Sequence, residues 1–264
     1  MRSLHLPERE ASIRFHDLPG SSPAVVFLHG LGAASSSDLA GVAARAPFAG
    51  RRRLLVDLLG FGFSDRPPGC AYTLDDHARS VAAVLDAARA GNCWVIGHSM
   101  GGTVAIVLAG LRPDLVSALV VAEGNLDPGV GSVSVEIAGW AEDEYLARGH
   151  QALLRQVSEA ARPEDPGMEA YLGAFRLADP LAVHRSAVGL LAPIHPTARE
   201  RLYRFSGPKA YVFGERSLPD PDQEHLPANG VEVIVIPGAG HSMTVEAPDD
   251  LARLVGGYLE RAAP

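Results

Sequence analysis

The 264-residue sequence has two cysteines, a single lysine and no long uninterrupted apolar segment. Cys70 and Cys93 are too few to form a disulfide framework, which excludes a small disulfide-stabilised scaffold. No stretch approaches the roughly 18 apolar residues that a membrane-spanning helix needs, and residues 1–8 lack the apolar core of a secretory signal. We therefore expect a cytoplasmic protein that does not insert into a membrane.

Basic residues are also scarce, since the formal net charge is −8 at pH 7. The only compact basic run, Arg51 to Arg53, leads into an apolar segment and is interpreted as a solvated strand entry. This charge balance argues against nucleic acid or an anionic membrane as a partner. The ten histidines never occur in a His-x-x-x-His spacing, and no Cys-x-x-Cys, P-loop or dinucleotide fingerprint is present. The sequence thus predicts neither a metal nor another cofactor, and oligomeric state cannot be read from it.

Short apolar runs alternate with longer helical patterns along most of the chain. A length of 264 residues with 47% hydrophobic residues suits one α/β domain carrying an insertion. The runs are nearly continuously apolar, which is typical of parallel strands covered on both faces. We expect strands at residues 24–28, 54–56, 94–96, 119–121, 210–213 and 231–236. Residues 12–15 alternate instead and are interpreted as an antiparallel edge strand. The predicted fold class is α/β, with a mostly parallel, doubly covered sheet.

Residues 125–194 break this alternation because their patterns are helical only. Met168, Tyr171, Leu172 and Phe175 follow a helical spacing, and Asp179 followed by Pro180 is typical of a helix start. A helical insertion between two strands is expected to cover the strand ends, where α/β sheets bind ligands. We therefore expect a core of residues 1–124 and 195–264 and a helical cap, or lid, of residues 125–194.

The most informative segment is GHSMGG, residues 97–102, which directly follows the apolar run CWVI. It predicts a strand, a sharp turn and a helix, with Ser99 at the tip of the turn. Gly97 and Gly101 remove side chains where the two backbones come close. The serine hydroxyl would then lie beside a helix N-terminus, whose free N–H groups favour developing negative charge. The segment indicates a nucleophilic serine.

Four segments together resemble the α/β-hydrolase fold family, in its order and at its spacing. They are HGLG at residues 29–32, DLLGFGFS at 57–64, GHSMGG at 97–102 and GAGH at 238–241. The resemblance covers nearly the whole chain and implies a capped serine hydrolase. It also implies that His241 is the base of Ser99, and that the backbone amides of Leu31 and Met100 form the oxyanion hole. His29 is expected to support the loop before Leu31, and His98 to pack or hydrogen-bond locally.

The acid of the implied triad is the point where the sequence departs from the commonest family pattern. That pattern places an aspartate three residues after the glycine that follows the seventh strand, whereas this chain has Ser217 there. A serine hydroxyl cannot supply the charge that stabilises an imidazolium. Glu123, directly after residues 119–122, is the favoured acid, because some capped members place theirs at this position. Asp220 is the alternative, and Asp127 is a more remote option.

The predicted function is hydrolysis of a carboxylic ester or lactone through an acyl-enzyme intermediate. Hydrolysis of a C–C bond in a β-diketone-like substrate is an alternative, as is a ligand-binding member of the fold without hydrolytic activity. The expected partner is a small, moderately apolar acyl substrate. Candidate substrate-binding residues are His29, Met168, Tyr171, Phe175 and Leu191, although apolar helical stripes more often serve plain packing.

Overall fold

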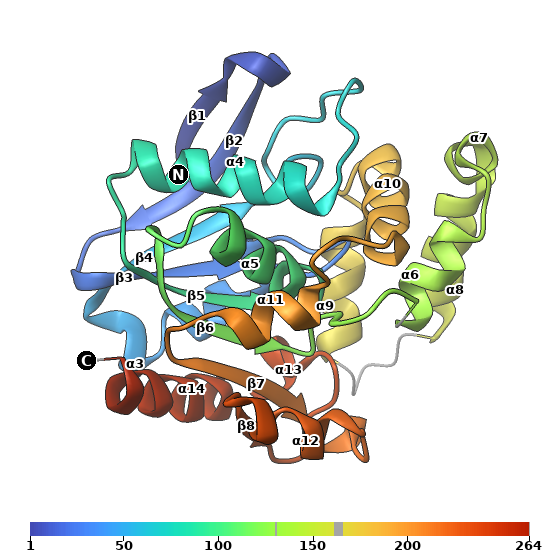
Figure 1. The fold of residues 1–264 in the computed structure, drawn as a ribbon. Coiled ribbons are helices and arrows are strands. Elements are labelled where there is room, and N and C mark those ends of the chain that lie inside the picture. Colours follow the sequence, from blue (N-terminus) through green and yellow to red (C-terminus); the bar gives the residue numbers. More distant parts are fainter. Residues whose placement is uncertain (130, 161–165, 264) are drawn as a thin grey trace.

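A mixed sheet of eight strands forms the centre of the computed structural model, which describes residues 1–129, 131–160 and 166–263 (Figure 1). Its strand order is β1-β2-β4-β3-β5-β6-β7-β8. Strands β3 to β8 pair in parallel, while β2 pairs antiparallel with both β1 and β4. The strands are β1 (Arg2–Leu6), β2 (Ala11–Leu18), β3 (Ser21–Leu28), β4 (Arg51–Asp57), β5 (Cys93–His98), β6 (Val116–Ala122), β7 (Lys209–Gly214) and β8 (Glu232–Ile236). The predicted fold class is confirmed.

One detail of the predicted sheet is wrong, and one strand was not predicted. Strand β2 is antiparallel, as its alternation indicated, but β1 pairs with its outer side, so β2 is not the edge. Strand β1 has a single fully buried residue, Leu6, and therefore no apolar run from which to predict it. At the opposite edge, β8 alternates between buried and partly exposed side chains after the exposed Glu232, because it has a neighbouring strand on one side only.

Helices cover both faces of the parallel strands. Side chains of alternate residues enter two separate cores, so Val26 and Leu28 of β3 face one core while Val25 and Phe27 face the other. The first core packs against α4 (Leu74–Ala87) and α5 (Met100–Leu111), and the second against α2 (Ala40–Ala43), α3 (Ala46–Ala49) and α14 (Pro248–Ala262). Thr73 caps α4 with a capping box, and α14 begins at Pro248.

The long connection from β6 to β7 consists of helices and turns in its described part. In Figure 1 most of these helices lie beyond the carboxyl ends of the parallel strands. They are α6 (Ser132–Ala138), α7 (Glu142–Glu144), the π-helix η2 (Tyr145–Gly149), α8 (His150–Ala160), α9 (Pro166–Phe175), α10 (Pro180–Leu191) and α11 (Ala198–Arg204). Asp179 caps α10 as predicted, and α11 packs on α5. The division into a core and a cap of residues 125–194 stays a prediction.

Short helices and turns complete the connections of the core. Helix α1 (Ser35–Asp38) follows β3, the 3₁₀ turn η1 (Pro7–Arg9) joins β1 to β2, and α13 (Met243–Glu246) follows β8. The link from β7 to β8 contains η3 (Glu215–Ser217), α12 (Asp222–His225) and η4 (Pro227–Asn229). Because the loops after β3, β5, β6, β7 and β8 leave the same end of a parallel sheet, they converge on one site.

Candidate active site

Ser99 lies in a sharp turn between β5 and α5. Its backbone angles, φ 52° and ψ −123°, fall outside the regions that a serine ordinarily adopts. Hydrogen bonds fix this conformation, since the Ser99 amide donates to the Ala122 carbonyl at 2.8 Å and the Gly102 amide donates to the Ser99 carbonyl at 2.8 Å. His98 and Met100 on either side are buried, whereas Ser99 is partly exposed. The turn therefore presents the Ser99 side chain at the carboxyl end of the central strand β5.

His241 and Glu123 form a short hydrogen bond, although they are 118 residues apart in the sequence. The Nδ1 of His241 lies 2.6 Å from Oε2 of Glu123. A carboxylate only accepts hydrogen bonds, so Nδ1 carries the proton and Nε2 is the free ring nitrogen. The His241 side chain is 55% exposed while that of Glu123 is 11% exposed. The pair thus presents a solvent-accessible imidazole held from behind by an enclosed carboxylate.

Three hydrogen bonds stabilise the Glu123 carboxylate. Burial acts to raise its pKa, but hydrogen bonds from His241, from the Gly214 amide and from the Ser217 hydroxyl outweigh burial, and the net pKa is lowered. The Gly214 amide donates to Oε1 at 2.8 Å. Glu123 itself has a left-handed backbone, with φ 45°, directly after the end of β6. Ser217 occupies the position at which the resembling family commonly has an aspartate. Its hydroxyl donates a hydrogen bond to the carboxylate of Glu123, which binds His241.

The other two candidate acids do not contact His241 in the described part of the chain. Asp220 accepts a hydrogen bond from the Asp222 amide at 2.8 Å. Asp127 forms an ion pair with Arg199, which also binds Asp222. The geometry thus favours Glu123 over both alternatives, because it alone of the three reaches the imidazole.

His98 fixes the backbone of the loop that carries His241. Its Nε2 donates to the carbonyl of His241 at 2.8 Å, and the two rings lie 4.9 Å apart. Burial and the neighbouring His241 lower the pKa of His98 to about 3, so its ring is neutral near neutral pH. A neutral donor in this place sets the position of the His241 loop without adding charge.

Replacing His98 with phenylalanine is expected to lower kcat/KM about tenfold, because the His241 loop loses its anchor and the imidazole is held less precisely. The matched variant His98→Gln keeps a donor near the same place and is expected to stay within about threefold of wild type. Steady-state kinetics with the melting temperature of each variant tests this. Equal losses in both variants would contradict a positioning role.

The loop of His29, Gly30 and Leu31 lies against the serine. A Cβ built on Gly30 would approach the Cβ of Ser99 to 3.2 Å. His29 is fully buried, with Nδ1 donating to the Gly30 carbonyl at 2.8 Å and Nε2 accepting from the Leu58 amide at 3.0 Å. Its expected role in supporting the loop fits this geometry. Its assignment as a substrate contact does not, because the ring is enclosed and does not line the cavity described next.

A cavity of about 1180 Å³ joins Ser99, His241 and Glu123. Met168 and Tyr171 of α9 line it, as the predicted substrate contacts require. The other two cap candidates do not line it. Phe175 is fully buried, because its ring stacks on His150 with centroids 4.6 Å apart and packs against Gly32. Leu191 is not among the residues that line the cavity, whereas its neighbour Leu190 is.

Two charged residues that the sequence analysis did not single out, Arg199 and Asp38, also line the cavity. Arg199 lies between Asp127 and Asp222 and also donates to the Tyr203 hydroxyl, so all five of its N–H groups are used. Asp38, the last residue of α1, comes from the connection after β3 and lines the cavity together with Leu31. Both belong to polar surface segments in the sequence, where no periodicity distinguishes a cavity residue from a solvated one.

Neither a metal cluster nor a membrane span is found where the chain is described. No group of three or more histidine, cysteine, aspartate or glutamate residues that could hold a metal ion occurs among the described residues. No helix in the same part of the chain is long and apolar enough to cross a membrane.

Several relatives resemble the chain over most of its length. It is 27% identical over 257 residues to the mouse sn-1-specific diacylglycerol lipase ABHD11, covering 90% of this chain and 81% of the mouse protein. It is 28% identical to the pimeloyl-[acyl-carrier protein] methyl ester esterase of Aeromonas salmonicida, covering 89% of this chain and 95% of that protein.

Solved structures share the fold. The enol-lactonase of Burkholderia xenovorans superposes with a TM-score of 0.81 at 19% identity, over 98% of this chain and 100% of that one. An esterase of Thermogutta terrifontis gives 0.78 at 21% identity, over 96% and 95%. The family model of the alpha/beta hydrolase fold matches residues 23–248. The chain therefore belongs to the α/β-hydrolase fold family, as the four sequence segments predicted.

Proposed function

We propose that the protein is a cofactor-independent serine hydrolase of carboxylic esters or lactones, with Ser99, His241 and Glu123 as its catalytic triad. The observation that carries the proposal is the 2.6 Å hydrogen bond between His241 and Glu123 at a cavity that Ser99 also lines. The relatives reported above include a lipase and an ester hydrolase, which supports the ester class.

The reaction starts with proton transfer from Ser99 Oγ to Nε2 of His241 as Oγ attacks the acyl carbonyl carbon. Glu123 stabilises the resulting imidazolium through Nδ1. No hydrogen bond from the Ser99 side chain to His241 is formed among the described residues, and such bonds often tighten only when substrate binds. The tetrahedral intermediate collapses as the imidazolium gives its proton to the leaving alkoxide. Water, deprotonated by His241, then attacks the acyl-enzyme and releases the acid and Ser99.

Two backbone amides are proposed to hold the oxyanion. Met100 is the first residue of α5, where amides have no partner within the helix and the helix dipole favours negative charge. Leu31 follows Gly30, which lies against Ser99, and Leu31 lines the cavity. Both donors belong to rigid backbone, so they need no reorganisation when charge develops.

Covalent labelling tests the nucleophile. A fluorophosphonate probe is expected to label the wild-type protein once, on Ser99, and the Ser99→Ala variant not at all, with the site confirmed by peptide mass spectrometry. Absence of labelling in the folded wild-type protein, or equal labelling of Ser99→Ala, would contradict the proposal. A panel of p-nitrophenyl esters, lactones and β-diketones then separates ester and lactone hydrolysis from C–C bond cleavage.

A further inference from the structure

Asp38 brings a carboxylate into the wall of the active-site cavity. It is the last residue of α1, seven positions after Leu31, and it lines the same cavity as Leu31 and Ser99. The side chain is partly exposed, and the hydrogen bond it accepts comes from the Ser37 hydroxyl, at 2.8 Å to Oδ1. Among the described residues, no arginine, lysine or histidine forms an ion pair with it.

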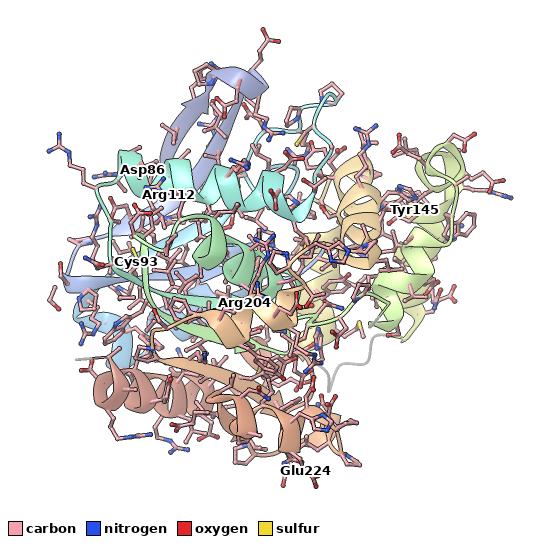
Figure 2. The ribbon with its side chains drawn as sticks, in the orientation of Figure 1. Asp86, Cys93, Arg112, Tyr145, Arg204 and Glu224 are labelled. Carbon is pink, nitrogen blue, oxygen red and sulfur yellow. The ribbon has the colours of Figure 1, made fainter. Side chains whose placement is uncertain are left out.

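Most other carboxylates of the cavity wall are neutralised or bound by the protein. Glu123 binds His241, and Asp127 and Asp222 share Arg199. Asp220 accepts a backbone amide. Glu224 is exposed at the periphery of the molecule, on α12 (Figure 2), where water solvates it. Asp38 differs from these groups because it is partly enclosed and, within residues 1–129, 131–160 and 166–263, has no ion-pair partner.

Holding such a carboxylate in place costs free energy unless a partner compensates for it. Burial and the neighbouring Asp57 raise the pKa of Asp38 to about 6, while the hydrogen bond from Ser37 acts to lower it. Asp57 itself is bound by the amide and hydroxyl of Ser36 and by the amide of Phe63. The described part of the chain thus places no ion-pair partner on Asp38 to stabilise its ionised form, and a positive charge can reach it from the open cavity.

An aromatic side chain lines the same cavity as this carboxylate. Tyr171 of α9 lines the cavity, and burial together with the charge of Asp38 raises the pKa of its phenol. Its hydroxyl lies 3.1 Å from the position of a Cβ built on Gly32, which places it beside the oxyanion loop. A carboxylate and an aromatic ring in the wall of one cavity are a combination that attracts organic cations, through charge and through the ring face.

We propose that Asp38, supported by Tyr171, is the specificity-determining residue that receives a cationic nitrogen of the substrate, so the preferred substrates are esters or lactones carrying an ammonium group. The inference rests on the proposed function. It also implies that substrates carrying an additional carboxylate bind poorly, because Asp38 repels them across the cavity.

Matched pairs of substrates test the proposal on both sides of the scissile bond. On the alcohol side, butyrylcholine is compared with 3,3-dimethylbutyl butyrate, which replaces the charged nitrogen by carbon. On the acyl side, the p-nitrophenyl esters of 4-(trimethylammonio)butyrate and 5,5-dimethylhexanoate form the same comparison. Wild type is expected to show a kcat/KM about tenfold higher for the cationic member of at least one pair.

Asp38→Asn keeps the size of the side chain and removes its charge. It is expected to abolish this preference while changing kcat/KM for the neutral esters less than about twofold. The control Glu224→Gln removes a cavity charge that is already solvated and should leave the preference intact. Wild type without a cationic preference in either pair, or a preference that persists in Asp38→Asn, would overturn the proposal. If wild type hydrolysed neither the neutral nor the cationic esters, the result would instead contradict the proposed hydrolase function.

The pH dependence gives a second readout. The groups that face Asp38 are Asp57 at the end of β4 and Tyr171 on α9, while α2 contributes no titratable side chain. Because the pKa of Asp38 is about 6, the carboxylate forms above that pH and the cationic preference should rise from pH 5 to pH 7.5. The ratio of kcat/KM for the two members of a pair cancels the pH dependence that both substrates share. A flat ratio in wild type would contradict the role of Asp38.

Discussion

Replacing Glu123 with glutamine is expected to lower kcat/KM by about four orders of magnitude. The amide is nearly isosteric and can still accept the hydrogen bond of the Gly214 amide on its oxygen. It cannot stabilise an imidazolium, and its NH₂ group facing Nδ1 of His241 would favour the tautomer in which Nε2 carries the proton. The effect should fall on kcat, measured by steady-state hydrolysis of a p-nitrophenyl ester, with the melting temperature recorded as a check of folding.

Asp220→Asn is the matched control for the acid. Asp220 lines the same cavity but accepts a backbone amide and does not reach His241 in the described structure. We expect its kcat/KM to stay within about threefold of wild type. The reverse pattern, a small effect for Glu123→Gln and a large one for Asp220→Asn, would move the acid to the loop after β7.

The Ser217 position offers a gain-of-function arm of the same experiment. The Ser217 hydroxyl donates a hydrogen bond to the Glu123 carboxylate, so an aspartate at this position would project toward the same imidazole. In the Glu123→Gln background, Ser217→Asp is therefore expected to recover about one to two orders of magnitude in kcat/KM. In the wild-type background, the same substitution places two carboxylates together and should lower activity instead.

Introducing a methyl group at Gly101 is expected to destabilise the protein by about 3–5 kcal/mol. A Cβ at Gly101 would lie 2.3 Å from the carbonyl oxygen of Leu28 and 2.5 Å from that of His29. Both obstacles are backbone atoms of the strand and loop beside the nucleophile, and they cannot rotate away. Thermal unfolding of Gly101→Ala should show a melting temperature lower by roughly 10 °C.

Gly41→Ala is the control for this substitution. Gly41 lies in α2, and a Cβ there would meet no atom within 4 Å. Alanine should therefore leave the melting temperature unchanged or raise it slightly, by about 1 kcal/mol or less in stability. A Gly101→Ala variant as stable as Gly41→Ala would show that the turn can relax, and that close backbone contact does not explain the glycine.

Most of the sheet could be predicted from the sequence because buried parallel strands need continuous apolar runs. Strands β3 to β7 carry such runs and lie where they were expected. The strand β1 was missed because it lies at the edge with one fully buried residue, Leu6. Its pairing with β2 depends on backbone hydrogen bonds, which leave little trace in side-chain composition.

The candidate site could be predicted only in part. The turn around Ser99 has a local signature, since Gly97 and Gly101 must be glycines for backbones to approach. No local signature identifies the carboxylate that binds His241, because Glu123 and Asp220 both follow strands of the same sheet. The cap residues show the same limit. Periodicity places Met168, Tyr171 and Phe175 on one helix face, but it does not say which of them reaches the cavity and which fills the interior.

By itself, the sequence determined the fold family and the positions of the sharp turn around Ser99 and of the histidine that follows the last strand, because each depends on residues that are close in the chain. Only the tertiary structure decided that Glu123 binds His241 and that Asp38 lines the cavity with no ion-pair partner among the described residues. Hydrogen bonding and charge compensation depend on distances between side chains in space. Those distances arise when separate strand ends meet at one edge of the sheet, and a linear sequence does not contain them.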